Sequence, residues 1–366
     1  MQECALAERL ITYDTSELDG IKAAAGFVKG WLESNDVAVK DGTHNDLPVL
    51  AATVGPDSGP TIVLHGHVDV VPGSPAQFDP RIEGDRLIGR GAYDMKGGLA
   101  GMMCAVRELR QQTDVRVHFV CVCDEESDEP FSRGSDYVVE KGYTGDFAIT
   151  GEPTDLRIGV QAKGVLALRI EVHGKSAHGS TPWEGDNAVL KAVDVFRQIQ
   201  SMPFAREASE LFDRPSISLG RIAGGDRINT VPGHCTIDVD IRYLPGQDPR
   251  AILADIRALP DTEVGVVLQR DPVNVERDNE FVVALADSVS EWTPADRVSI
   301  GRDGASDAIS FIDAGVPAVE FGPVGGGHHG PDEWVSIESL ARYSQALVTF
   351  VRELPATAGR GHLRIA

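Results

Sequence analysis

Two short segments of this chain are almost entirely apolar, TIVLH at 61–65 and DFAIT at 146–150. A strand has this composition when both of its faces are buried, which happens mainly in sheets that helices cover on both sides. Nearby segments alternate between strand and amphipathic-helix patterns. They are strand candidates at 47–54 and 115–123 and helix candidates at 16–34 and 98–110. The sequence therefore predicts an α/β fold whose sheet is sandwiched by helices.

The segment from 162 to 273 has a different pattern. Its strand candidates at 165–172, 216–222 and 236–243 alternate apolar and polar residues, so one face of their sheet is expected to be open. Two helices fit between these strands, one capped by Asp186 and the other by Asp248. The side chains expected to face inward from the first helix are Val189, Leu190, Val193 and Phe196. The pattern predicts a smaller α+β domain.

The last part of the chain returns to the first pattern. Residues 304–315 predict a helix that ends at Gly315, 317–322 predict a short strand, and 336–354 predict a helix capped by Ser336. We therefore expect a discontinuous large domain, 1–161 and 274–366, into which a small domain, 162–273, is inserted. Residues 357–366 have little pattern and are expected to form a loose tail.

Charge and cysteine content exclude several classes of protein. The chain has 34 basic and 56 acidic residues and a net charge of −22, which argues against binding to nucleic acid or to an anionic membrane. No apolar run reaches the 18 residues of a membrane span, and no signal-peptide pattern is present. Five cysteines without framework spacing predict a reducing, cytoplasmic location. Cys121 and Cys123 are interpreted as core residues of a buried strand, with metal binding as the alternative.

Acidic residues and histidines follow several of the predicted buried strands. In an open α/β sheet the carboxyl ends of such strands meet where ligands bind. We therefore expect these side chains to converge on one site, although each alone has an ordinary explanation as a loop, capping or hydrogen-bonded residue. They are His65, His67, Asp69, Asp94, Glu125, Glu126, Glu152, His328 and His329.

The crowding of acidic residues at 124–129 (DEESDE) predicts a cation. Carboxylates repel one another when buried together, and a divalent metal ion neutralises them. Imidazole plus carboxylate without thiolate suits zinc first, with cobalt or manganese as alternatives, because calcium and magnesium prefer oxygen ligands alone. Two histidines and three carboxylates are enough for two ions that share a bridging carboxylate. A further carboxylate is then free to move a proton.

Five motifs, taken in order, identify a family resemblance. HGHVDVVPG, GRGAYDMKGG, DEE, GEP and HGPDE resemble the dizinc aminoacylases and exopeptidases that include acetylornithine deacetylase and succinyl-diaminopimelate desuccinylase. The resemblance covers nearly the whole chain, including HGKSAHGSTPWEGDNA in the insert. One departure is the segment after DEE, which is often glycine-rich in the family and reads SDEPFSRGSD here.

The resemblance implies roles for the converging residues. His67 and Glu152 correspond to ligands of one zinc, Glu126 and His329 to ligands of the other, and Asp94 to the bridging carboxylate, followed by a cis peptide bond. His329 is preferred to His328 because the family places its ligand at H-x-x-D/N-E, which here ends in Asp332 and Glu333. Glu125 corresponds to the general base. Asp69, two residues after His67, is expected to orient that imidazole.

The resemblance also implies residues that contact the substrate. His178 of the insert is expected to donate to the oxyanion, in some relatives from the partner subunit, and the alternative is a surface-loop histidine. Asn229 and Arg242 are expected to bind substrate, and for Arg242 an exposed ion pair is equally compatible with the pattern. Lys163 is a further candidate, and so is Ser306 in the Gly304–Asp307 loop.

The family resemblance makes the expected activity metal-dependent amide hydrolysis. The substrate is expected to be an N-acyl amino acid, of the acetylornithine or succinyl-diaminopimelate type, with two metal ions activating water and Glu125 acting as base. A dipeptidase or aminopeptidase is the alternative within the family, and a non-catalytic metal-binding homologue is the alternative of another class. The insert is expected to act as a lid and to join two copies into a homodimer.

Overall fold

The computed structural model describes residues 2–111, 114–127, 133–291, 299–304 and 306–354. The expected tail at 357–366, and Asp128 and Glu129 of the acidic segment, lie outside these residues. The chain divides into two compact units. Unit 1 comprises residues 1–160, 275–300 and 306–366, and unit 2 comprises residues 161–274 and 301–305.

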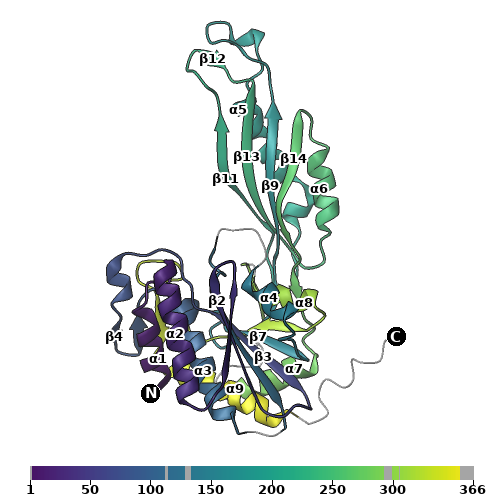
Figure 1. Ribbon diagram of the computed structural model, residues 1–366. Coiled ribbons are helices and arrows are strands. Elements are labelled where there is room, and N and C mark those ends of the chain that lie inside the picture. The colour runs from purple at the N-terminus through teal and green to yellow at the C-terminus, as the bar shows by residue number, and fades with distance from the viewer. Residues whose placement is uncertain (1, 112–113, 128–132, 292–298, 305, 355–366) are drawn as a thin grey trace. The chain divides into compact units, whose positions relative to one another are not determined.

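Unit 1 is built on a mixed sheet, of which Figure 1 labels strands β2, β3 and β7. Its strands run in the order β1-β2-β6-β3-β7-β17-β8. Strands β6, β3, β7 and β17 are parallel to their neighbours in this group, and β2 is antiparallel to β6. The bounds are β1 Val39–His44, β2 Leu47–Val54, β3 Thr61–His67, β6 Arg116–Val122, β7 Phe147–Thr150, β8 Ile158–Ala162 and β17 Ala318–Glu320. The four strands predicted for residues 47–150 are confirmed, and the parallel ones are buried almost throughout.

Helices pack on both faces of this sheet, as predicted. Helices α1, α3, α7 and α9 pack together, and α3 covers β3 and β6. Helices α4 and α8 contact each other and also lie on the sheet. Successive residues of β3 point to opposite faces of the sheet. The imidazole of His65 meets Phe311 of α8 on one face. A Cβ at the next residue, Gly66, would meet Met95 and Leu99 on the face that α3 covers. The bounds are α1 Gln2–Ile11, α2 Leu18–Ser34, α3 Gly97–Leu109, α4 Gly134–Glu140, α7 Glu280–Val289, α8 Ala308–Asp313 and α9 Ile337–Glu353.

A second, small sheet in unit 1 joins two loops that matter for the site. Its strand order is β18-β19-β5-β4, and it pairs Trp334–Ser336 with Arg86–Ile88. The bounds are β4 Arg81–Glu83, β5 Arg86–Ile88, β18 Gly325–Gly326 and β19 Trp334–Ser336. This sheet therefore places the loop after β18 beside the loop after β5. Two short helical segments lie in the same region, η1 Pro75–Phe78 and η2 Ala92–Lys96.

Unit 2 is a four-stranded antiparallel sheet in the order β11-β13-β9-β14. Side chains alternate between buried and less buried along β9 and β13, so one face carries the core, as predicted from the alternating sequence. Helices α5 and α6 pack on that core face. The bounds are β9 Gly164–His173, β11 Ser216–Gly224, β13 His234–Tyr243, β14 Thr262–Arg270, α5 Ala188–Ser201 and α6 Pro249–Arg257. The remaining short elements are β10 Ala177–His178, β12 Thr230–Val231, β15 Val273–Asn274, β16 Ser299–Arg302, η3 Pro182–Glu184 and η4 Pro203–Arg206.

Three details of the sequence-based assignment differ from the structure, and several further elements, among them α1, α4, α7 and β1, were not predicted. The cap of α5 is Asn187, whose side chain accepts from the backbone N–H groups of Val189 and Leu190, and not Asp186. Of the side chains predicted to face inward, Val189 and Phe196 are partly buried against the core, but Leu190 is 63 % exposed. The residues that α5 buries are Ala188, Ala192, Val195 and Ile199.

The second and third errors concern α8 and β14. Helix α8 begins at Ala308 and ends at Asp313, so the predicted helix at 304–315 is too long at both ends. Strand β14 was not predicted at all, because its buried face is weak and most of its residues are exposed. The caps predicted at Asp248 and Ser336 are confirmed, since each side chain accepts a backbone N–H of its helix. Within the described residues, every helix is too short or too polar to cross a membrane.

Candidate metal centre

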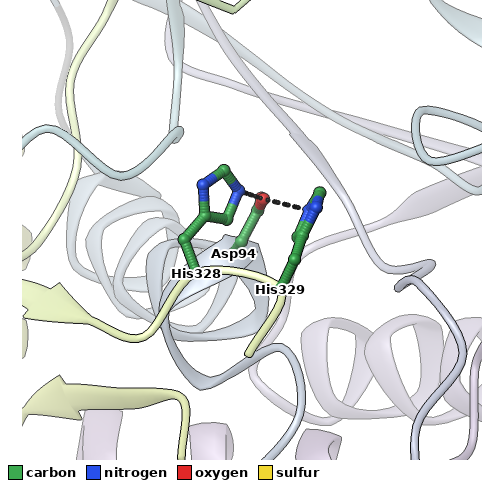
Figure 2. Close-up of side chains that lie close together, drawn as sticks. All are labelled: Asp94, His328 and His329. Carbon is green, nitrogen blue, oxygen red and sulfur yellow. Dashed lines mark hydrogen bonds and ion pairs between the residues drawn. The ribbon is translucent and has the colours of Figure 1, made fainter. Parts of the chain in front are cut away.

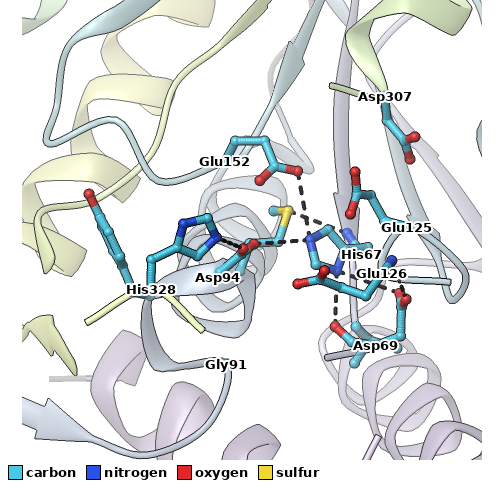
Figure 3. Close-up of polar contacts among 12 residues, drawn as sticks. His67, Asp69, Gly91, Asp94, Glu125, Glu126, Glu152, Asp307 and His328 are labelled. Atoms are coloured by element: carbon cyan, nitrogen blue, oxygen red, sulfur yellow. Dashed lines mark hydrogen bonds and ion pairs between the residues drawn. The ribbon is translucent and has the colours of Figure 1, made fainter. Parts of the chain in front are cut away.

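Four of the predicted site residues lie at the carboxyl ends of the parallel strands of unit 1. His67 is the last residue of β3, Glu125 and Glu126 follow β6, and Glu152 follows β7. Neighbouring parallel strands end at the same edge of the sheet, so their loops deliver side chains to one place. Figure 3 shows these side chains converging there. The structure thus brings together residues that are far apart in the sequence.

Asp94 reaches the same place from the loop that precedes α3. The peptide bond between Asp94 and Met95 is cis, as the resemblance implied. The loop starts at Gly91, whose φ of 78° lies in the left-handed region that glycine adopts readily. Gly98 packs so closely on the loop after β7 that a Cβ there would lie 2.3 Å from the carbonyl oxygen of Gly151. These glycines allow the loop to bring the Asp94 carboxylate to the edge of the sheet.

His67 is fully buried between carboxylates (Figure 3). Its Nε2 lies 3.3 Å from Asp94 Oδ1 and 3.7 Å from Glu152 Oε1. Its Nδ1 lies 3.0 Å from the backbone carbonyl oxygen of Asp69 and 3.5 Å from the carboxylate of the same residue. When Nδ1 donates to that carbonyl, Nε2 presents its lone pair toward Asp94 and Glu152. This is the tautomer that a metal-binding histidine requires.

Two adjacent histidines reach Asp94 from the loop between β18 and β19 (Figure 2). His329 Nε2 lies 3.3 Å from Asp94 Oδ2 and 3.0 Å from Glu126 Oε1. His328 Nε2 also contacts Asp94 Oδ2. The sequence placed His328 among the converging residues, but it did not predict this contact. His329 is the one that joins two of the expected ligands, Asp94 and Glu126. Its assignment as ligand stays a prediction, with His328 as its neighbour at the same carboxylate.

The side chains form three overlapping groups among the described residues. In each group one ligand atom per residue lies within 4.8 Å of the others. Asp94 belongs to two of the groups, as a bridging carboxylate must. The groups are Asp94 with His328 and His329, His67 with Asp94 and Glu152, and His67 with Glu125 and Glu126.

The protonation of this cluster is strongly perturbed. Burial, and after it the nearby charge of Asp307, raise the pKa of Glu125 to about 8. Burial and the charge of Asp94 also raise the pKa of Glu152 well above its usual value. Burial works against the charged form of His67, but the surrounding carboxylates outweigh it and raise its pKa well above 6.5. The cluster is therefore short of positive charge, which a bound cation supplies.

The donor atoms fit a divalent metal ion. Oε1 of Glu152 and Oδ1 of Asp69 are buried without a hydrogen-bond partner. A buried oxygen in this state costs free energy unless a cation or donor reaches it. Because Glu152 Oε1 faces the Nε2 of His67, an ion between them satisfies both atoms. Imidazole and carboxylate donors together suit zinc, cobalt or manganese.

The cysteines of the chain take no part in this donor set. All five are buried and free. Burial raises the pKa of the Cys121 thiol to about 12 and that of Cys123 well above its usual value. A thiol that stays protonated is a poor metal ligand. Their interpretation as core residues agrees with this environment.

Glu333 organises the Asp94 loop, a role that the sequence motif did not disclose. This residue is 1 % exposed, and its Oε1 accepts the backbone N–H groups of Tyr93 and Asp94, both at 3.0 Å. Its Oε2 accepts from the Gly91 N–H at 3.0 Å and from Arg90 Nη1 at 2.8 Å. Arg90 in turn donates to the carbonyl oxygen of His329 at 3.2 Å. One buried ion pair thus joins the loop of the bridging carboxylate to the histidine loop.

His178 and Asn229 lie together in unit 2. His178 pairs with Thr230 across the short β10–β12 ladder, and the Gly179 N–H donates to the carbonyl oxygen of Asn229 at 2.7 Å. Both predicted residues are exposed. The imidazole Nδ1 of His178 lies 2.8 Å from the Ser180 hydroxyl. The structure thus places two expected substrate contacts in adjacent loops of unit 2. Their action on a substrate stays a prediction.

The other expected substrate contacts have partners within the chain. Arg242 Nε lies 3.0 Å from Asp240, which matches the ion-pair interpretation, and its contact with a substrate stays a prediction. Lys163 is 5 % exposed, and its Nζ lies 2.7 Å from Asp303 Oδ1. Ser306 is buried beside the start of α8, where its hydroxyl accepts from the Ala308 N–H at 3.1 Å.

Comparison with known proteins agrees with this geometry. Residues 63–353 match the model of Peptidase family M20/M25/M40. A succinyl-diaminopimelate desuccinylase of Gluconobacter oxydans is 31% identical over 327 residues, which cover 83% of this chain and 84% of the relative.

Solved structures show the same fold. Aminopeptidase PepT from Bacillus cereus superposes with a TM-score of 0.80 at 22% identity, covering 96% of this chain and 98% of the other. A dinuclear metal-binding M20 peptidase from Bacillus subtilis superposes with a TM-score of 0.68 at 17% identity, covering 95% and 98%. The resemblance seen in the sequence motifs is therefore confirmed. The protein belongs to Peptidase family M20/M25/M40 and is a metallohydrolase of that family.

Proposed function

We propose that the protein hydrolyses the amide bond of an N-acyl amino acid. The observation that supports this most directly is the cluster in unit 1, in which five candidate metal ligands lie together and one further carboxylate, Glu125, lies beside two of them, His67 and Glu126. The similarity to a succinyl-diaminopimelate desuccinylase over most of the chain favours an acyl substrate. Acetylornithine and succinyl-diaminopimelate are the two substrates that we propose to test first.

His67, Asp94 and Glu152 are proposed to hold one metal ion. Asp94 is proposed to bridge to a second ion held by Glu126 and His329, the pair whose side chains lie 3.0 Å apart. Two divalent ions, when bound, supply Lewis acidity toward the amide carbonyl and toward water. Zinc is our first choice, and cobalt or manganese suit the same donors.

Glu125 is proposed to act as the general base. A base must be near the reacting water and have a pKa close to the working pH. Burial and the charge of Asp307 raise the pKa of Glu125 to about 8 in the absence of ions, and bound cations stabilise its ionised form. The carboxylate then accepts the proton of the attacking water and passes it to the leaving amine. His178 and Asn229 are proposed to contact the substrate from unit 2, with Arg242, Lys163 and Ser306 as further candidates.

Two copies of the chain are proposed to pair through unit 2. Large apolar side chains are exposed on this unit, and exposed apolar side chains mark an interface where they form one contiguous patch. Trp183 is 77 % exposed and Leu190 is 63 % exposed. Light scattering on the purified protein tests this proposal, and a monomer at all accessible concentrations contradicts it.

A substrate panel tests the proposed reaction. The protein is dialysed against a chelator and reloaded with zinc, cobalt or manganese, and turnover is measured on acetylornithine, succinyl-diaminopimelate, other N-acyl amino acids and dipeptides. We expect hydrolysis of an N-acyl amino acid that depends on the metal. Faster hydrolysis of dipeptides identifies a peptidase instead, and metal-loaded protein that hydrolyses none of the compounds contradicts the proposal.

Neighbouring glutamates provide a matched pair of variants for the mechanism. Glu125→Gln is expected to bind the same amount of metal as the wild type while its turnover falls to near background. Glu126→Gln is expected to lose metal as well as activity, because this residue is a proposed ligand. Metal content by elemental analysis distinguishes the two, and substantial turnover by Glu125→Gln refutes the role of the base.

A further inference from the structure

An arginine stands between the proposed base and a second buried carboxylate. Arg133 Nη1 lies 3.3 Å from Glu125 Oε1 and 3.2 Å from Asp307 Oδ1. Figure 3 shows the carboxylates of Glu125 and Asp307 near each other. Arg133 belongs to the segment in which this chain departs from the glycine-rich pattern of its family. We propose that Arg133 and Asp307 are positioning residues that hold the Glu125 carboxylate in its catalytic orientation.

Asp307 is fixed in place by neighbours on two other elements. It is 1 % exposed, and its Oδ2 accepts from the hydroxyl of Ser135 at the start of α4. The same hydroxyl lies 2.8 Å from Nε2 of His65 on β3, and that nitrogen is 3.6 Å from Asp307 Oδ2. A buried polar group with several partners has little freedom to move. Asp307 is therefore a rigid support for the guanidinium that contacts it.

A second pair of polar contacts ties the helix starts together. The Ser310 hydroxyl of α8 donates to Asp136 Oδ1 of α4 at 2.7 Å, and Asp136 Oδ2 accepts the backbone N–H of Arg133 at 3.3 Å. The backbone of Arg133 is thus anchored to α4, and α4 is anchored to α8. Both ends of the arginine are held, so its position relative to Glu125 is set by the fold and not by the substrate.

The charges explain why an arginine is needed here. Glu125 and Asp307 are both carboxylates, and without a cation between them their repulsion moves the more exposed one, Glu125, whose side chain is 17 % exposed against 1 % for Asp307. Metal ions held by the neighbouring proposed ligands would also attract Glu125. An arginine presents several donors in a fixed plane, whereas a lysine offers one compact charge that is harder to share between two carboxylates. The structure thus predicts that lysine replaces Arg133 only in part.

The inference rests on the proposed function, so its test includes a readout that needs no substrate. Crystal structures of the metal-loaded wild type and Arg133→Met are compared, and we expect the Glu125 carboxylate to leave its place or to occupy several rotamers in the variant. Metal content is expected to be unchanged, because Arg133 touches none of the proposed ligands. A Glu125 side chain that keeps one position in Arg133→Met overturns the proposal.

Kinetics on a hydrolysed substrate give the second readout. A displaced base lowers kcat and leaves substrate binding nearly unchanged. We expect Arg133→Met to lower kcat by about 10- to 100-fold with KM altered less than about 3-fold, and Arg133→Lys to recover part of the loss. Asp307→Asn is expected to lower kcat by a smaller factor. The double variant Arg133→Met/Asp307→Asn is expected to resemble Arg133→Met, because the two residues act as one unit.

Other kinetic results overturn the proposal. A raised KM with unchanged kcat in Arg133→Met shows that the arginine binds substrate. If Arg133→Met does not fold, the other two variants decide. Wild-type kcat in both Arg133→Lys and Asp307→Asn then overturns the proposal. Arg342→Met, on the surface of α9, is the control that should match the wild type. Wild-type protein that hydrolyses nothing on the panel counts against the proposed function alone, because the crystallographic comparison still decides the role of Arg133.

Discussion

Glu333 shows how much of the metal centre depends on a residue that binds no metal. Its carboxylate accepts from three backbone N–H groups of the Asp94 loop and from Arg90. Glu333→Gln keeps the size of the side chain but leaves one acceptor oxygen and turns an NH2 group toward donors. We expect a loss of about 3–5 kcal/mol in unfolding free energy, as for a broken buried ion pair, and a 10- to 100-fold weaker affinity for metal. Denaturant unfolding and calorimetric titration of the metal-free protein measure the two effects.

The adjacent residue supplies the control for Glu333. Asp332 has the same charge, but its side chain is 83% exposed and its partner Arg81 lies 3.6 Å away. Exposed ion pairs of this kind contribute little to stability. Asp332→Asn is therefore expected to match the wild type in both measurements. If Glu333→Gln binds metal as tightly as Asp332→Asn does, Glu333 does not position the Asp94 loop.

The start of α5 shows what limits prediction at the level of a single element. Asp186 and Asn187 are both good capping residues, so the sequence alone does not decide which one begins the helix. Successive residues of a helix point about 100° apart, so an error of one residue in the inward stripe changes which side chains pack on the sheet. The structure has Asn187 as the cap and packs small residues, Ala188 and Ala192, against the sheet of unit 2. Packing against strands that are distant in the sequence determines which side chains of α5 face the sheet.

Capping variants test the assignment of α5. Asn187→Ala removes the acceptor for the N–H groups of Val189 and Leu190 and is expected to cost about 1 kcal/mol of unfolding free energy. Asp186→Ala removes an exposed ion pair with Lys191 and is expected to cost less. Urea denaturation of both variants measures the difference. An equal or larger loss in Asp186→Ala contradicts the assignment.

The proposed metal ligands could be predicted from the sequence, but the residues that hold the site in place could not. His67, Asp94, Glu126, Glu152 and His329 were predicted because strand ends and motif spacing are local signals that sequence carries directly. Arg90, Arg133 and Asp307 were not assigned roles, because each acts through a partner more than 100 residues away or across a helix interface. Charged residues in loops look alike until the fold shows which of them are buried together. His328 was expected at the site, but its contact with Asp94 was not predicted, because adjacent histidines of a loop look alike until the fold orients them.

The buried imidazole of His118 makes the unfolding free energy of the whole molecule depend on pH. Burial, together with the charges of Arg116 and Lys40, lowers its pKa to about 4 from an ordinary 6.5. Between these values the unfolded chain binds a proton at His118 that the folded chain does not, so stability falls as the pH falls from 6.5 toward 4. His118→Gln removes this contribution. We expect its unfolding free energy to decrease less than that of the wild type between pH 6.5 and 4.5.

Urea denaturation at a series of pH values makes this comparison. Thr53, whose hydroxyl lies 2.8 Å from His118 Nδ1, gives the control variant Thr53→Val, which removes the hydrogen bond and keeps the imidazole. Its stability is expected to be lower at every pH but to decline with acid as steeply as that of the wild type. Parallel pH profiles for wild type and His118→Gln contradict the role of His118.

Metal removal is expected to destabilise the entire protein. Only the folded chain brings the carboxylates and histidines together, so a bound metal ion stabilises the folded state alone. A ligand that binds only the folded state stabilises it by about 2.7 kcal/mol at 100 times its Kd. Chelator treatment is therefore expected to lower the thermal midpoint by several degrees, and zinc to restore it. Asp94→Asn, which alters the carboxylate shared by two of the groups, is expected to respond little to chelator, while Glu125→Gln responds like the wild type. Calorimetric scans measure the midpoints, and a wild-type midpoint that is the same with and without chelator rules out metal binding at this cluster.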